Sequence, residues 1–173
     1  MVIDTRKTLG SLVDEIWATR GIADDFYWTE WTTTPPYLEV MFKEFVDRFP
    51  KEIPGREGNS TPLKDRKDYS VWMERIGKFL YEAISNANRH GNKDIPTKKI
   101  SIARYYGSRG VVYSIYDEGL GFNVGDTIKK LSESNEKRKS GFTLFQQSEM
   151  TVTFNSKGNI TYFMYLCKPQ KPL

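Results

Sequence analysis

A carboxylate, an amide and an imidazole form the first group of side chains that could do chemistry. Glu82, Asn86 and His90 fall at i, i+4 and i+8 of a segment with helical periodicity, so they share one side of that helix. They lie at the shoulder of its apolar stripe, where polar groups line the edge of a cleft or cap a neighbouring loop. Glu82 and Asn86 alone also fit an ordinary solvated helix shoulder.

A second group follows a predicted strand and combines a carboxylate with glycines. In the segment Asp117-Glu118-Gly119-Leu120-Gly121-Phe122, Asp117 provides an acceptor where glycines allow a sharp turn and the close approach of a ligand. A third group, Ser140-Gly141-Phe142-Thr143, lies where a polar loop enters a predicted helix, whose free N–H groups can bind phosphate. Taken singly, the second group also fits a glycine-rich turn and the third an ordinary N-cap.

Composition narrows the chemistry further. The 173-residue chain has one histidine, His90, and one cysteine, Cys167. These numbers exclude an internal disulfide and a Cys/His zinc cluster, and a Cys167–His90 nucleophilic pair has no specific support. A cation, if the protein uses one, is therefore expected to be a hard ion with oxygen ligands, such as Mg²⁺.

Charge and hydropathy predict a cytoplasmic protein without a membrane partner. No apolar run reaches the roughly 18 residues of a membrane span, and the first residues lack the pattern of a signal peptide. The net charge is +4, and the isoelectric point is about 9.0. The basic residues are scattered beside acidic ones, so the charge does not favour nucleic acid as a ligand.

The chain divides into residues 1–25, an N-terminal extension, and residues 26–173, the main domain. An amphipathic helix is predicted over residues 4–20, capped by Asp4 or Thr5 and followed by Gly21. Its apolar face consists of Leu9, Leu12, Val13, Ile16 and Trp17. This face suits packing on the helix's own domain, with partner binding or dimerisation as the alternative.

The order of the remaining elements predicts the architecture. We expect strands at 26–33, 99–106, 110–117, 151–155 and 160–167, helices at 36–49, 69–90 and 142–149, and loops at 50–68 and 123–140. Strands 99–106 and 110–117 form one hairpin and the last two strands another. This order favours a two-layer α/β sandwich with a mixed, mostly antiparallel sheet and helices on one face.

The long helix at 69–90 has distinct faces on a 3.6-residue wheel. The predicted buried face contains Trp72, Ile76, Phe79, Leu80, Ala83 and Ala87. The opposite, solvated face contains Glu74, Lys78, Ser85 and Asn88.

In this order and spacing, the three groups together resemble the nucleotide-binding boxes of the GHKL ATPase superfamily. That superfamily includes histidine kinases, type II topoisomerase ATPase domains, mismatch-repair ATPases and anti-sigma-factor kinases. The run from Glu82 through Asn86 to His90-Gly91-Asn92, followed by Lys98-Lys99-Ile100, is most similar to the anti-sigma-factor serine kinases. The resemblance covers about residues 26–167 and implies a Bergerat-type ATP-binding fold.

The resemblance implies a role for each matching position. Asn86 would ligate Mg²⁺ on the phosphates of ATP, Glu82 would act as the general base, and Asp117 would accept a hydrogen bond from the adenine amino group. Further nucleotide contacts would come from Gly119, Gly121, Phe122, Lys139, Gly141, Phe142 and Thr143. Residues 123–140 would form a lid whose Lys137, Arg138 and Lys139 reach phosphate, although a solvated charge run is the simpler interpretation of these three. His90 would cap the helix and pack under the nucleotide.

One position departs from the family pattern, because Lys139 replaces the first glycine of the last box. This change bears on lid closure more than on adenine recognition. The resemblance implies an ATP-binding regulatory kinase that sequesters a protein such as a sigma factor and phosphorylates a serine on an antagonist. The alternatives are a protein-binding module tuned by ATP or ADP without kinase activity, and the ATPase domain of a histidine kinase-type sensor.

Overall fold

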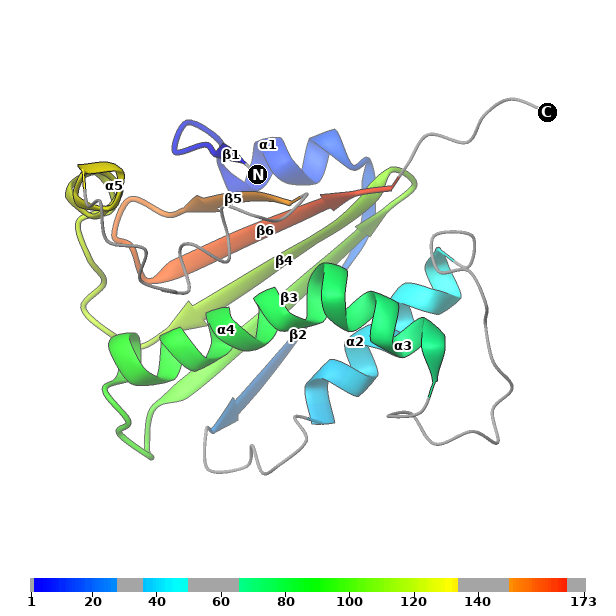
Figure 1. Cartoon of the computed structure of the whole chain (residues 1–173), viewed down its shortest axis with the longest axis horizontal. Helices are drawn as coiled ribbons and strands as arrows, with labels where there is room; N and C mark the ends of the chain where they lie inside the picture. The colour runs from blue at the N-terminus through cyan, green and yellow to red at the C-terminus, as the bar shows by residue number, and fades with distance from the viewer. Residues whose placement is uncertain (1, 28–35, 50–65, 134–149, 168–173) are drawn as a thin grey trace.

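Six strands form a single sheet in the order β1-β5-β6-β4-β3-β2 (Figure 1). The computed structural model describes residues 2–27, 36–49, 66–133 and 150–167. All neighbouring strands are antiparallel except β1 and β5, which are parallel. The strands are β1 (Val2–Ile3), β2 (Ala18–Tyr27), β3 (Lys99–Gly107), β4 (Gly110–Asp117), β5 (Thr151–Phe154) and β6 (Ile160–Leu166).

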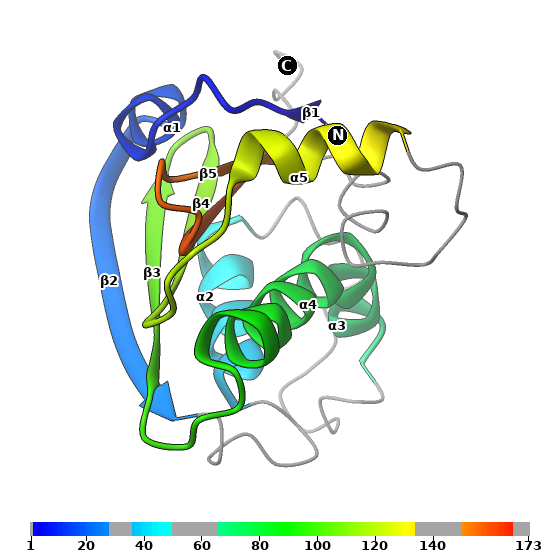
Figure 2. The ribbon, with the colours of Figure 1, turned by 90° about the vertical axis from the view of Figure 1, so that its left-hand side faces the viewer.

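Helices cover one face of this sheet and form its main hydrophobic core. Figure 2 shows α2 (Pro36–Arg48) and the long helix on this face. The long helix is continuous over residues 67–92 and consists of α3 (Lys67–Trp72), the π-helical η3 (Met73–Gly77), α4 (Lys78–Asn86) and the π-helical η4 (Ala87–Asn92). The apolar residues of α2 and of the long helix pack against alternate residues of the central strands.

The two-layer α/β sandwich predicted from the sequence is confirmed, as are α2, the long helix and both hairpins. The six residues expected on the buried face of the long helix are all buried. Ser85 and Asn88, expected in solvent, are buried as well. The Asn88 Nδ2 donates to the Asp94 carboxylate beyond the end of the helix, a contact that a helical wheel does not report.

The N-terminal segment differs from the predicted helix over residues 4–20. Val2 and Ile3 form β1, which pairs with β5, and the helix α1 spans only Leu9–Glu15. Its cap is Thr8, not Asp4 or Thr5, because the Thr8 and Ser11 side chains bond each other's backbone N–H groups in a capping box. The helix ends where Trp17 takes a left-handed conformation, with φ of 55°. Gly21 consequently lies within β2.

The helix α1 packs on the opposite face of the sheet from α2. Leu12 and Ile16 are buried there against Val112, Tyr162 and Met164. Trp17 was expected on the same apolar face, but its side chain is 64% exposed and stacks on the Arg109 guanidinium at 5.3 Å. The division into an extension, 1–25, and a domain, 26–173, stays a prediction, while β1 and β2 both belong to the common sheet.

Two further expectations need correction. The first strand of the main domain runs over 18–27, whereas residues 28–33 of the predicted strand lie outside the described residues. The first half of the predicted loop 123–140 is the helix α5 (Val124–Glu133), capped by the Asn123 side chain, which accepts the Asp126 N–H. The predicted loop at 50–68 lies mostly outside the described residues, as does the predicted helix at 142–149.

Candidate functional site

The end of the long helix meets the start of β3 and the turn after β4, and Asn92 joins all three. Its side chain is fully buried, with 0% of its surface exposed. The Asn92 Nδ2 donates to the carbonyl of Lys99 at 3.0 Å, and its Oδ1 accepts the Glu118 N–H at 2.9 Å. From the sequence, Asn92 was predicted only as part of the helix motif, without a role of its own.

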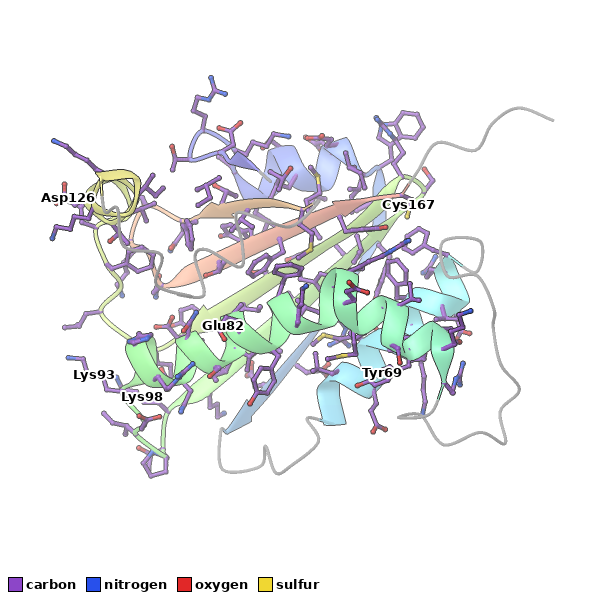
Figure 3. All side chains as sticks on the ribbon, in the orientation of Figure 1. Tyr69, Glu82, Lys93, Lys98, Asp126 and Cys167 are labelled. Carbon is purple, nitrogen blue, oxygen red and sulfur yellow. The ribbon has the colours of Figure 1, made fainter. Side chains whose placement is uncertain are left out.

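Glu118 adds a second connection between the turn and β3. Its Oε2 accepts the Lys99 N–H at 2.8 Å, and its carbonyl accepts a hydrogen bond from the Lys98 Nζ at 3.2 Å. Figure 3 shows Lys93 and Lys98 at this end of the long helix. Glu118 therefore connects the turn to the start of β3 through both its side chain and its main chain.

Asp117 is the buried carboxylate at this junction, with 8% of its surface exposed. Among the described residues, the hydrogen bond to its carboxylate comes from the Gly119 N–H, which reaches Oδ1 at 2.9 Å. Burial raises the pKa of Asp117, and the Gly119 bond and the charges of Lys98 and Lys157 only partly oppose that rise. A buried carboxylate with so few donors can accept further hydrogen bonds from a ligand.

Glycine lets the helix end approach this carboxylate directly. A Cβ at Gly91 would lie 2.2 Å from the Asp117 Cγ, and a Cβ at Gly119 would lie 2.3 Å from the Gly91 carbonyl oxygen. Neither distance is compatible with a side chain. Gly91 and Gly119 therefore belong to the construction of the site, although the sequence analysis gave a role only to Gly119.

The β5–β6 hairpin binds the turn from its other side. The Asp117 N–H donates to the Asn159 carbonyl at 3.1 Å, and the Asn159 Nδ2 donates to the Asp117 carbonyl at 3.3 Å. The Phe122 N–H donates to the Lys157 carbonyl at 3.1 Å. Gly121, at φ of 77°, lies so close to that carbonyl that a Cβ would approach it to 1.9 Å. The predicted positions Asp117, Gly119, Gly121 and Phe122 thus belong to one rigidly bonded turn.

Glu82 and Asn86 lie one helical turn apart on α4, further from the helix end. Figure 3 shows the position of Glu82. Both side chains are half-buried, in agreement with the predicted shoulder position. The Arg89 Nη2 lies 3.9 Å from the Glu82 Oε1. Arg89 was not predicted as a site residue, although its position seven residues after Glu82 places it two turns along the same side of the helix.

His90 does not cap the helix end, and its packing under a nucleotide stays a prediction. Its side chain is exposed, and the helix continues to Asn92, whose buried side chain makes the terminal contacts instead. The remaining predicted site residues, Lys139, Gly141, Phe142 and Thr143, lie outside the described residues, as do Lys137 and Arg138.

The oxygen-bearing side chains on α4 fit a magnesium nucleotide. A magnesium ion bound together with phosphates usually has only one or two protein ligands and keeps several waters. The half-buried Asn86 offers one amide oxygen, and the neighbouring Glu82 offers a carboxylate. In the described part of the chain, no group of three or more His, Cys, Asp or Glu side chains is arranged to hold a metal.

A comparison with protein-family models agrees with this site. The model of the histidine kinase-like ATPase domain matches residues 71–163, more than half of the chain. The chain therefore belongs to the family of histidine kinase-like ATPase domains, and the predicted GHKL membership is confirmed. Domains of this family bind ATP, generally with Mg²⁺, so membership supports an ATP-binding regulatory function.

No curated protein matches the chain. None of the helices among the described residues is long and apolar enough to span a membrane.

Proposed function

We propose that the chain is a cytoplasmic, ATP-binding serine kinase of the anti-sigma-factor type, which also sequesters a protein partner. The observation that carries the proposal is the junction of Asp117 with the end of the helix that bears Glu82 and Asn86. A buried, under-bonded carboxylate suits an adenine amino group, and a carboxylate and an amide further along the helix suit phosphate chemistry.

The proposed reaction transfers the γ-phosphoryl group of ATP to a serine hydroxyl. Glu82 accepts the hydroxyl proton while the serine oxygen bonds to phosphorus, and the bond from phosphorus to the β–γ bridging oxygen breaks, releasing ADP. When bound, Mg²⁺ would neutralise phosphate charge, with Asn86 as its protein ligand. Arg89, whose Nη2 lies 3.9 Å from the Glu82 Oε1, adds a positive charge beside the proposed base in this scheme.

The contacts to the phosphates belong to the same proposal. Gly141, Phe142 and Thr143 are proposed at the phosphate end, with Lys139 as a phosphate contact in place of a glycine.

The protein partners are proposed as a sigma factor or an antagonist of the anti-sigma type. Partner binding and dimerisation through residues 1–25 remain alternatives, although α1 buries Leu12 and Ile16 on its own sheet.

Titration calorimetry with Mg-ATP and Mg-ADP tests the nucleotide site. We expect binding by the unmodified protein and a loss of affinity of about 100-fold in Asp117→Asn, because the substitution removes the charged acceptor for the base. Asp25→Asn is the matched control, since Asp25 is an exposed aspartate on β2. Absence of ATP and ADP binding by the unmodified protein would contradict the proposal.

Phosphoryl transfer separates the kinase from the two alternatives. The protein is incubated with γ-labelled ATP and with the products of neighbouring genes, and serine phosphorylation is measured. Transfer that disappears in Glu82→Ala, while ATP affinity stays within about threefold of the unmodified protein, supports the kinase. Nucleotide binding without transfer supports the binding module, and transfer to a histidine supports a histidine kinase-type domain.

A further inference from the structure

Asn92 is a buried polar side chain of the long helix that bonds to the turn after β4. Its amide oxygen is bonded to Glu118, the residue next to Asp117, and its amide nitrogen is bonded to the first residue of β3. Ile100 of β3 pairs with Asp117 of β4 in the sheet. The two residues to which Asn92 bonds, Lys99 and Glu118, are therefore the direct chain neighbours of this pair. The Asn92 side chain therefore connects the end of the long helix to the turn after β4.

The bonds around the turn follow one another along the backbone. The N–H of Glu118 is held by Asn92, and the N–H of Gly119 is held by the carboxylate of Asp117 itself. Consecutive N–H groups on either side of Glu118 are thus fixed, which restricts rotation of the peptide that follows Asp117. On the helix, the residue before Asn92 is Gly91, which rests against the same carboxylate.

We propose that Asn92 is a positioning residue that orients the Asp117 carboxylate and thereby sets the selectivity for adenine over other purines. This inference rests on the proposed nucleotide function. Asn92 touches neither the base nor the phosphates. It acts through the Glu118 N–H, which keeps the carboxylate pointing at the place of the adenine amino group.

The same helix contains a matched control in Asn88. This side chain also belongs to η4 and is nearly as buried, with 2% of its surface exposed. Its Nδ2 donates to the Asp94 carboxylate, on the loop that leads to β3, and not to the Asp117 turn. Truncation of either asparagine removes a buried hydrogen bond, so both variants should lose stability. Only truncation at Asn92 releases the turn.

The experiment compares ADP with inosine diphosphate, in which an oxo group replaces the adenine amino group. Affinities are measured by calorimetry for the unmodified protein, Asn92→Ala, Asn92→Asp and Asn88→Ala. We expect the unmodified protein to prefer ADP by about 100-fold and Asn92→Ala to lose at least about tenfold of that preference. Asn88→Ala should keep the preference within about threefold.

Asn92→Asp separates positioning from stability. Its carboxylate keeps the acceptor for the Glu118 N–H but loses the donor to the Lys99 carbonyl, so the variant should be destabilised. Positioning predicts that it keeps most of the ADP preference despite that loss. A purely structural role predicts instead that the preference falls in proportion to the melting temperature in all three variants.

Four outcomes of the affinity measurements would overturn the inference. Three leave the proposed function standing: an unchanged ADP preference in Asn92→Ala, an equal loss in Asn88→Ala, or an equal loss in Asn92→Asp. The fourth, no ADP binding by the unmodified protein, overturns the proposed function together with the inference. Amide hydrogen exchange of the Glu118 N–H without nucleotide should be fast in Asn92→Ala and slow in Asn88→Ala, and an equal rate in the two would also overturn it.

Discussion

Two buried aspartates, one at the start of α3 and one at the end of β4, have opposite surroundings. Asp68 is fully buried. Its carboxylate accepts hydrogen bonds from the Arg66 Nε at 3.0 Å and from the Arg66 Nη2 at 2.6 Å. The hydrogen bonds from this guanidinium lower the pKa of Asp68. Asp117 is almost as buried but has no such partner among the described residues, and burial raises its pKa.

The buried Arg104 on β3 follows the pattern of Asp68. Its guanidinium donates to the Glu44 carboxylate of α2 at 2.8 and 3.2 Å and to the Asp24 carboxylate of β2 at 2.6 Å. Tyr106 donates a further bond to Glu44 at 2.7 Å. Charges that are paired inside the fold join its elements together, whereas Asp117, which has no ion-pair partner among the described residues, is available to a ligand.

The largest expected effect comes from breaking the paired region. Arg104→Ala removes the shared partner of Glu44 and Asp24, so the free energy of unfolding should fall by about 3 kcal/mol, measured by urea denaturation. Arg109→Ala, which removes an exposed guanidinium stacked on Trp17, should change it by less than about 0.5 kcal/mol. Similar losses in the two variants would mean that the buried pairing does not stabilise the fold.

The next largest effects are expected when either aspartate, Asp117 or Asp68, is replaced by asparagine. Asp117→Asn should weaken ATP binding by about 100-fold, or about 2.7 kcal/mol, without lowering the stability of the free protein. Asp68→Asn should do the reverse: it should lower the stability by about 2 kcal/mol and leave ATP affinity within about threefold. Calorimetry and urea denaturation on both variants measure the two quantities. A loss of affinity in Asp68→Asn equal to that in Asp117→Asn would remove the distinction between the two regions.

The two aspartates should also produce pH dependences of opposite sign. The raised pKa of Asp117 means that the folded state binds more protons than the unfolded state between the ordinary value of 3.8 and the raised value. Across that window Asp117 lowers stability as the pH rises. The lowered pKa of Asp68 gives a contribution that is complete above 3.8 and is lost as the pH falls through the lowered value.

Urea denaturation between about pH 3 and pH 7 separates these contributions. The stability of Asp117→Asn relative to the unmodified protein should increase with pH, and the deficit of Asp68→Asn should shrink as the pH falls. Parallel curves for the two variants would show that their carboxylates do not differ in the folded state. ATP affinity should fall with decreasing pH as Asp117 becomes protonated.

The smallest expected effect concerns Lys98, whose ammonium bonds to the turn. The Lys98 charge favours the ionised form of Asp117, and its ammonium donates to the Glu118 carbonyl. Lys98→Ala should weaken ADP binding by about threefold at low salt, and the difference should shrink at about 0.5 M salt. Lys43→Ala, at an exposed site on α2, serves as the control. A difference that does not depend on salt would contradict an electrostatic role for Lys98.

Much of the fold could be predicted because its signals are local. Period-2 and 3.6-residue patterns located both hairpins, α2 and the long helix. The N-terminal segment could not be predicted in this way, because β1 has two residues and its partner is β5, far along the chain. The wheel of the long helix misplaced Ser85 and Asn88 because it does not report contacts outside the helix, such as the hydrogen bond from Asn88 to Asp94.

In the candidate site, too, residues of a contiguous motif could be predicted, whereas residues whose roles depend on contacts distant in sequence could not. Asp117, Gly119 and Gly121 were found because the motif is contiguous and follows a strand. The roles of Gly91 and Asn92 depend on contacts with the turn some 26 residues later, as the Asn92–Glu118 bond shows. No periodicity reports such a contact. That no cationic side chain among the described residues hydrogen-bonds to the Asp117 carboxylate likewise depends on three-dimensional packing.

The pairing of β1 with β5 affects how the chain folds during synthesis. Val2 pairs with Thr151, about 150 residues later, and the Thr153 hydroxyl donates to the Lys7 carbonyl. Residues 2–16 leave the ribosome long before these partners exist, and the strand β6, on which Leu12 and Ile16 pack, is made later still. Pairings so distant in sequence form slowly and late. The nascent chain therefore carries an unprotected apolar α1 until the last hairpin emerges, and this interval is when association with chaperones or with other chains is most favoured.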